Sequence, residues 1–243
     1  MRYPELKFKI DYNKDVKTFF NFVNEADFDD GRNLEWAILK KYPYFQQYKK
    51  GNTLKINKVI AEKFIKSVYL KNQPVMIKNM SIYQKDWLSL EKDFYHLVNS
   101  LFCDHIWPKG KYIAYATTWG MFPRFLDEKT FQIPFKHKKK KYIPVIIAHE
   151  MLHFIFYDYF YKKYPGYESD EYNFFVWHVS EIFNALIQSS PNWLKIFKMG
   201  SMSYPEHDKI INKLSKKYHK KIGWDIDSLI KEILECVRKN KLA

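Results

Sequence analysis

The amino-acid sequence predicts an α+β fold that is mostly helical. Helix-period apolar patterns fill most of residues 13–103, and such patterns return from residue 143 to near the end of the chain. Between them, only two short segments are rich in β-branched and aromatic residues, as strands are. A small sheet should therefore precede the helix that begins near residue 143.

Four helices are expected in the first part of the chain, at residues 14–26, 33–41, 54–71 and 81–102. The last of them should begin at Ser81, because Ser81 and Gln84 have the spacing of a capping box. The pattern then divides the chain into a helical N-terminal region, 1–105, packed on a core formed by 106–243.

In the second part, residues 111–119 and 130–135 are the expected strands, and Gly120, Pro123 and Asp127 mark a turn-containing connection between them. Four further helices are expected at residues 143–162, 169–189, 205–220 and 225–239. Pro144 and Pro205 suit the first turns of their helices, where a missing N–H costs nothing.

Composition narrows the class of protein. The chain has 243 residues, of which 47% are hydrophobic, so it can build a real core. Only two cysteines occur, which excludes a disulfide framework, and the N-terminal residues do not resemble a secretory signal. The longest apolar stretch, Ile143–Tyr157, is too short and too interrupted to span a membrane. We therefore expect a soluble cytoplasmic protein.

The net charge of +14 raises the question of an anionic partner. The densest basic run, Lys136–Lys141, lies between two apolar segments and is expected to be a solvated loop. An excess of Lys, Asn, Ile, Tyr and Phe would also follow from an AT-rich genome. Nucleic acid is therefore a less favoured partner.

The Asp-rich stretch Asp27–Gly31 is expected to be a plain turn between helices, because its glycine is misplaced for a calcium loop.

The pattern that indicates chemistry is His149-Glu150-Met151-Leu152-His153. On a helix, side chains four residues apart share a face, so both imidazoles can reach one metal ion. Glu150, beside the first imidazole, can then act as general base toward a water that the metal activates. The residues around this motif are almost all apolar, so the helix should be buried and its polar side chains need partners.

A second apolar helix supplies a third ligand. His178, Glu181 and Asn184 interrupt it every three residues and so share one face. We expect Glu181 to be the ligand, on a helix packed antiparallel to the first, with His178 as the alternative. Asn184 and His178 would otherwise orient a ligand or face the substrate.

An HExxH helix followed by a glutamate on the next helix resembles the gluzincin branch of zincin metallopeptidases, and more distantly the intracellular peptidases of the ImmA/IrrE kind. The resemblance covers residues 111–190 and rests on His149, Glu150, His153 and Glu181. It implies a zincin-like core, a Zn²⁺ cofactor, a peptide or protein substrate, and hydrolysis with Glu150 as general base. It also implies that the strands 111–119 and 130–135 hold an extended substrate.

Gluzincins also use a Tyr or a His to stabilise the oxyanion of the transition state. The candidates here are His178, Tyr204 and His207, and Arg124 is a candidate for binding a substrate carboxylate.

Three other readings stay open. An endoribonuclease with a His-x3-His-x5-His motif would need a third histidine where Tyr159 stands. Peptide deformylases pair an HExxH with an upstream cysteine, here Cys103. A zinc-stabilised protein that only binds a partner would keep the metal but would not need Glu150.

Overall fold

The computed structural model describes residues 3–24, 35–51, 53–120, 122–220 and 224–242. The chain forms two compact units, each built from separate stretches of sequence. Unit 1 comprises residues 1–4, 85–110 and 141–243, and unit 2 comprises residues 5–84 and 111–140. The boundary expected from the sequence, at residues 105–106, lies within unit 1.

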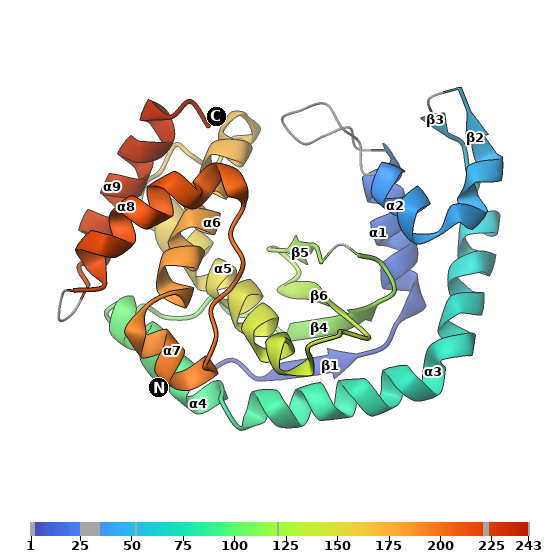
Figure 1. The fold of residues 1–243 in the computed structure, drawn as a ribbon, viewed down its shortest axis with the longest axis horizontal. Helices are drawn as coiled ribbons and strands as arrows, with labels where there is room; N and C mark the ends of the chain where they lie inside the picture. Colours follow the sequence, from blue (N-terminus) through green and yellow to red (C-terminus); the bar gives the residue numbers. More distant parts are fainter. Residues whose placement is uncertain (1–2, 25–34, 52, 121, 221–223, 243) are drawn as a thin grey trace. The chain divides into compact units, whose positions relative to one another are not determined.

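Unit 2 contains a mixed four-stranded sheet in the order β1-β4-β6-β5. Its strands are β1 (Leu6–Lys9), β4 (Tyr112–Thr117), β5 (Arg124–Phe125) and β6 (Thr130–Pro134). Strand β4 pairs in parallel with both β1 and β6, whereas β5 pairs antiparallel with β6 at the edge of the sheet. Figure 1 shows the three longer strands side by side. Residues of β4 and β6 are almost all buried, as in other parallel sheets.

The rest of unit 2 is mainly helical. Its elements are α1 (Tyr12–Asn24), α2 (Glu35–Lys41), the 3-10 helix η1 (Pro43–Tyr48), a hairpin of β2 (Lys49–Lys50) and β3 (Thr53–Leu54), and α3 (Lys58–Leu88), which belongs to unit 2 up to Gln84. An apolar cluster joins these elements to the end of β4, and it includes Phe19, Phe45, Ile65 and Trp119.

A buried carboxylate connects α1 to the sheet. Asp15 is fully buried; its Oδ2 accepts hydrogen bonds from the main-chain N and the Oγ1 of Thr118, both 2.8 Å away. Its Oδ1 accepts a hydrogen bond of 2.8 Å from Gln132 Nε2. Burial nevertheless dominates and raises the pKa of Asp15 to about 6.

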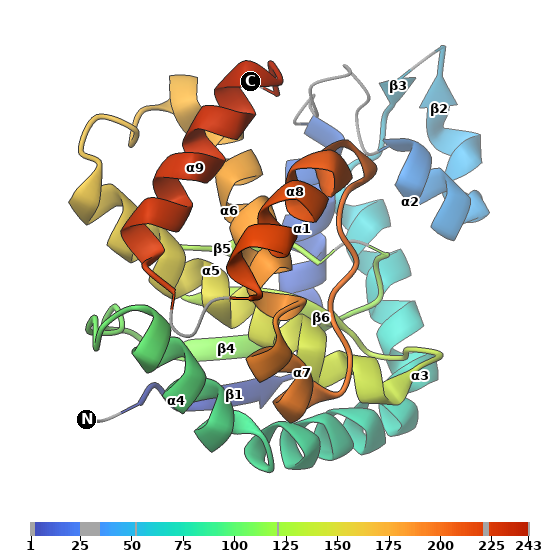
Figure 2. The ribbon, with the colours of Figure 1, turned by 60° about the vertical axis from the view of Figure 1, so that its left-hand side comes forward.

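Unit 1 consists of helices packed around a central one. They are α4 (Glu91–Leu101), α5 (Ile143–Lys163), α6 (Asn173–Gln188), α7 (Pro191–Phe197), α8 (Asp208–Tyr218) and α9 (Ile226–Lys239). Three short 3-10 turns accompany them: η2 (Lys140–Tyr142), η3 (Asp170–Tyr172) and η4 (Pro205–His207). The first residue of η2 belongs to unit 2. Helix α6 contacts α5, α7, α8 and α9, and its middle is buried on all sides. Figure 2 shows α8 and α9 crossing α6.

The α+β class and the order of most elements agree with the sequence, but one boundary was wrong. Ser81 and Gln84 lie inside α3, which continues without a break through Pro74 to Leu88, so no helix begins at Ser81. The break falls at residues 89–90 instead, before α4. The sequence pattern also missed β1, β5, the β2–β3 hairpin and α7. The expected turn at Asp27–Gly31 lies outside the described residues.

No helix in the described part of the chain combines the length and apolarity needed to cross a bilayer.

Candidate metal centre

Two antiparallel helices of unit 1 build the site. Three contacts follow one another along them: Gln188 of α6 reaches the main-chain carbonyl of Val145, Asn184 reaches that of His149, and Glu181 reaches the His153 ring. Because residue numbers fall along α6 as they rise along α5, the two helices run in opposite directions, as the sequence predicted. Figure 1 shows them adjacent.

The apolar character of both helices explains this packing. Apart from His149, Glu150 and His153, α5 is apolar from Ile143 to Tyr157, and nearly all of this stretch is buried. Helix α6 is buried from Phe175 onward with little interruption. A helix that is apolar all round can satisfy its surface only inside a core. The polar side chains of the two helices are therefore forced to meet one another.

The structure brings His149, His153 and Glu181 together. His149 Nε2 lies 3.0 Å from His153 Nε2 and 3.3 Å from Glu181 Oε2, and His153 Nε2 lies 3.3 Å from Glu181 Oε1. Two ligand atoms bound at ~2.0–2.1 Å to one tetrahedral Zn²⁺ lie ~3.3–3.4 Å apart. The three side chains can thus hold one metal ion.

The electrostatics of the three side chains are coupled. Burial acts to lower the pKa of His149, but the Glu181 carboxylate outweighs it and raises that pKa to about 9. Burial likewise acts to raise the pKa of Glu181, but the charges of His153 and His149 hold it well below its usual value. A negative charge is therefore kept at Glu181, where a cation can offset it in an otherwise apolar setting.

Glu150 lies next to His149 on α5 and is also buried, with 6% of its surface exposed. Its negative charge contributes to the raised pKa of His149. The expected general base thus belongs to the same charged cluster as the three candidate ligands.

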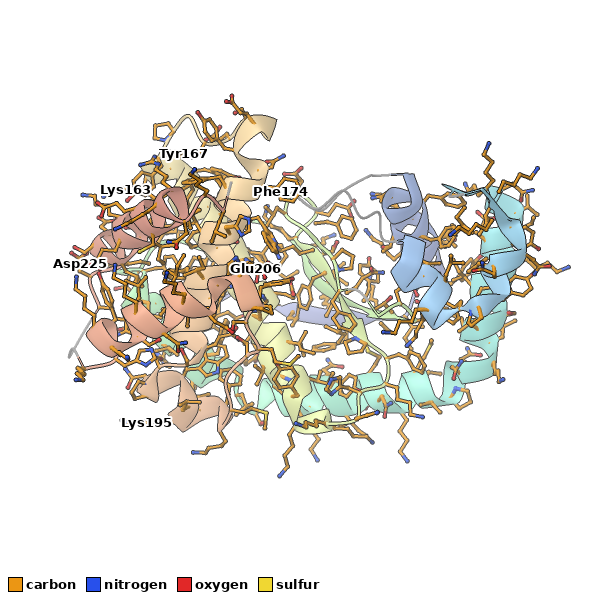
Figure 3. All side chains as sticks on the ribbon, turned by 45° about the horizontal axis from the view of Figure 1, so that its top comes forward. Lys163, Tyr167, Phe174, Lys195, Glu206 and Asp225 are labelled. Atoms are coloured by element: carbon orange, nitrogen blue, oxygen red, sulfur yellow. The ribbon has the colours of Figure 1, made fainter. Side chains whose placement is uncertain are left out.

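A second polar group lies one turn before Glu181 on α6. His178 Nδ1 is 2.7 Å from His207 Nε2, and both rings are buried. Trp177 packs against His178 and Tyr204 packs against His207. The ring centroids of Trp177 and Tyr204 are 5.0 Å apart. Burial and the neighbouring His178 lower the pKa of His207. The three expected oxyanion stabilisers, His178, Tyr204 and His207, therefore lie in one cluster. Figure 3 labels Glu206, which belongs to the same η4 turn as His207.

His178, the alternative third ligand, is directed to His207 through Nδ1. In the described part of the chain, the group of side chains able to hold a metal contains Glu181 and not His178. Asn184 donates a hydrogen bond of 3.2 Å to the main-chain oxygen of His149, so it contacts the backbone of a candidate ligand.

Sequence reasoning missed Gln188. This fully buried residue accepts a hydrogen bond of 2.7 Å from His149 Nδ1. A signal existed, because Gln188 continues the polar face of His178, Glu181 and Asn184 by one more turn. Gly200 packs against its main-chain oxygen, and a Cβ at that position would come within 2.9 Å of it.

The remaining candidates lie elsewhere. Cys103 is exposed and is not part of the group that could hold a metal among the described residues. Tyr159, at the third histidine position of the ribonuclease motif, donates a hydrogen bond to Asp227. Arg124 belongs to β5 of unit 2.

Comparison of the chain with protein-family models, with curated proteins and with solved structures finds no significant match.

Proposed function

We propose that this chain is a zinc-dependent peptidase. The observation that carries the proposal is the spacing of the three donor atoms of His149, His153 and Glu181, which is 3.0 to 3.3 Å. That spacing matches three corners of a tetrahedron around one ion and leaves the fourth corner for water or substrate.

The donor set supports zinc over other ions. Two imidazoles and one carboxylate are the protein ligands of many catalytic zinc sites, whereas Mg²⁺ and Ca²⁺ take oxygen ligands almost exclusively. When bound, Zn²⁺ lowers the pKa of a coordinated water toward ~7 and polarises a carbonyl group.

Glu150 supplies the proton transfers. As the residue beside His149 on α5, it can accept the proton of the attacking water while that water adds to the carbonyl carbon of the substrate. It then returns the proton to the leaving amine as the C–N bond breaks. No other group is needed to balance the protons of the hydrolysis.

His178 lies one turn before Glu181 on α6, and with its neighbours His207 and Tyr204 it supplies hydrogen-bond donors. Because burial disfavours charge on His207, the pair is suited to donating an N–H from a neutral ring. Such a donor stabilises negative charge that develops on a carbonyl oxygen. The resemblance to the gluzincins, which rests on His149, Glu150, His153 and Glu181, favours a peptide among carbonyl substrates.

The proposal is tested with the full chain loaded with one equivalent of zinc and incubated with a mixture of peptides of defined sequence. Mass spectrometry should detect new cleavage products that disappear when a chelator is added. The control variant is Glu150→Gln, which has nearly the same size, cannot accept the proton and should keep the zinc. Its turnover should fall ~10²–10⁴-fold. Cleavage that persists at the wild-type rate in Glu150→Gln would contradict the assigned role.

A further inference from the structure

The side-chain amide of Gln188 joins a metal-ligand ring to the backbone of the opposite helix. Its Oε1 lies 2.7 Å from His149 Nδ1, and its Nε2 lies 3.2 Å from the main-chain oxygen of Val145. The residue is fully buried at the C-terminal end of α6.

The carbonyl of Val145 fixes which way this amide points. A carbonyl oxygen only accepts hydrogen bonds, so the NH₂ group of Gln188 must face Val145. The amide oxygen then faces His149, and since that oxygen also only accepts, His149 Nδ1 must carry a hydrogen. In the neutral ring, the lone pair is therefore on Nε2, the nitrogen directed at His153 and Glu181.

We propose that Gln188 is a positioning residue that holds His149 in the tautomer able to bind a metal through Nε2. The inference deepens the proposed function and rests on its metal site. Hydrogen bonds from a ligating histidine to a second residue fix both the tautomer and the direction of the ring. Here the acceptor is a neutral amide, so it adds no charge to the site.

Asn184 provides a matched control one turn earlier on α6. It too is fully buried, and it too donates a 3.2 Å hydrogen bond to a main-chain carbonyl of α5, that of His149. Gln188 and Asn184 thus tie the same two helices together in the same way. They differ in that only Gln188 accepts a hydrogen bond from the ligand ring.

The experiment compares zinc affinity in the full chain by competition with a chromogenic chelator. Gln188→Met keeps the length of the side chain but removes the acceptor, and should weaken zinc binding ~10–100-fold. Asn184→Leu removes a hydrogen bond to the main-chain oxygen of His149 but none to its ring, so it should weaken zinc binding less than Gln188→Met does. Gln188→Glu restores an acceptor for His149 but loses the donor to Val145, so it should recover much of the affinity lost in Gln188→Met.

Equal losses of zinc affinity in Gln188→Met and Asn184→Leu, or no recovery in Gln188→Glu, would show that Gln188 only holds the two helices together and would overturn the assignment.

A second readout does not depend on any variant. In zinc-loaded wild type labelled with ¹⁵N-histidine, the His149 ring should carry its hydrogen on Nδ1 and its metal on Nε2. The reverse arrangement would overturn the inference, whereas a wild-type chain that binds no zinc would overturn the proposed function itself.

Discussion

Glu181 Oε1 lies 3.3 Å from His153 Nε2, although 28 residues separate them and they belong to different helices. Glu181 is 6% exposed and His153 is fully buried, so the carboxylate meets the imidazole away from solvent. A buried carboxylate with its pKa held below the usual range needs a cation close by. Without a metal, that cation is a protonated histidine, and this has consequences for the effect of pH.

We expect the metal-free protein to lose stability as the pH rises from 7 to 9. The pKa of His149 is about 9 in the folded chain, against an ordinary value of 6.5, so between these values the folded state binds more protons than the unfolded state. Its contribution is complete below pH 6.5 and disappears as the pH passes 9, a loss on the order of 1–3 kcal/mol. Urea unfolding of chelator-treated protein at several pH values measures it.

The control for that experiment is Glu181→Gln, which keeps the shape of the side chain but removes the charge that raises the pKa of His149. Its stability should vary less between pH 7 and 9 than that of the wild type. The same linkage predicts that zinc binding at pH 7–8 releases the proton of His149, in addition to any proton that a zinc-bound water loses. An identical pH dependence in the two proteins would argue against the ion pair.

The histidine pair should make unit 1 sensitive to acid. Burial and His178 lower the pKa of His207 in the folded state, so the unfolded chain binds the proton more readily. Stability should therefore decrease as the pH falls from 7 to 5. His207→Gln retains hydrogen-bonding capacity beside His178 and removes this titration. Urea unfolding should show a weaker dependence on pH in His207→Gln; a slope as steep as in the wild type would contradict the prediction.

Asp15→Asn should destabilise the fold of unit 2 by ~1–3 kcal/mol, despite the similar size of the two side chains. Both carboxylate oxygens of Asp15 face donors, from Thr118 on one side and Gln132 on the other. In Asp15→Asn, an NH₂ group replaces one of these oxygens. That NH₂ group then faces an N–H or O–H donor, and two donors cannot form a hydrogen bond with each other. Rotating the Gln132 amide would turn its oxygen toward that NH₂ group, but the Thr18 hydroxyl, which now donates to Gln132 Oε1, would then have to accept a hydrogen bond instead.

The midpoint of urea unfolding measures this loss, with Thr18→Val as a comparison that removes only one hydrogen bond at the edge of the same network. The pKa of Asp15, which is raised to about 6, predicts a second effect, on the pH dependence of stability. The wild type should become less stable as the pH rises from 4 to 6, and Asp15→Asn should not. An Asp15→Asn variant as stable as the wild type at pH 7 would contradict this reading of the network.

The candidate site was largely predictable because its pattern is local. Residues four apart on one helix and three apart on the next share faces, so His149, His153 and Glu181 could be grouped before their distances were known. Gln188 follows the same rule but ends the helix, where a polar residue is usual and attracts no notice. The pairing of His178 with His207 depends on how η4 packs against α6, which no spacing records.

Elements that depend on distant partners were less predictable. Strand β1 has four residues and becomes a strand by pairing with β4, which is more than 100 residues away. The Ser81–Gln84 pattern matches a helix start, yet both residues lie inside α3. Local capping signals can thus be overridden when a helix is held along its length by its surroundings.

The measurement that tests the metal centre most directly is zinc affinity in wild type, Glu181→Ala and His178→Ala, determined by competition with a chromogenic chelator and supported by elemental analysis. We predict about one Zn²⁺ per wild-type chain, as in other sites of this kind. Glu181→Ala should lose it, because two imidazoles remain without the anion, whereas His178→Ala should retain it with at most ~10–100-fold weaker affinity. Near-equal affinities of wild type and Glu181→Ala, or a wild-type chain refolded with excess zinc that holds none, would contradict the account.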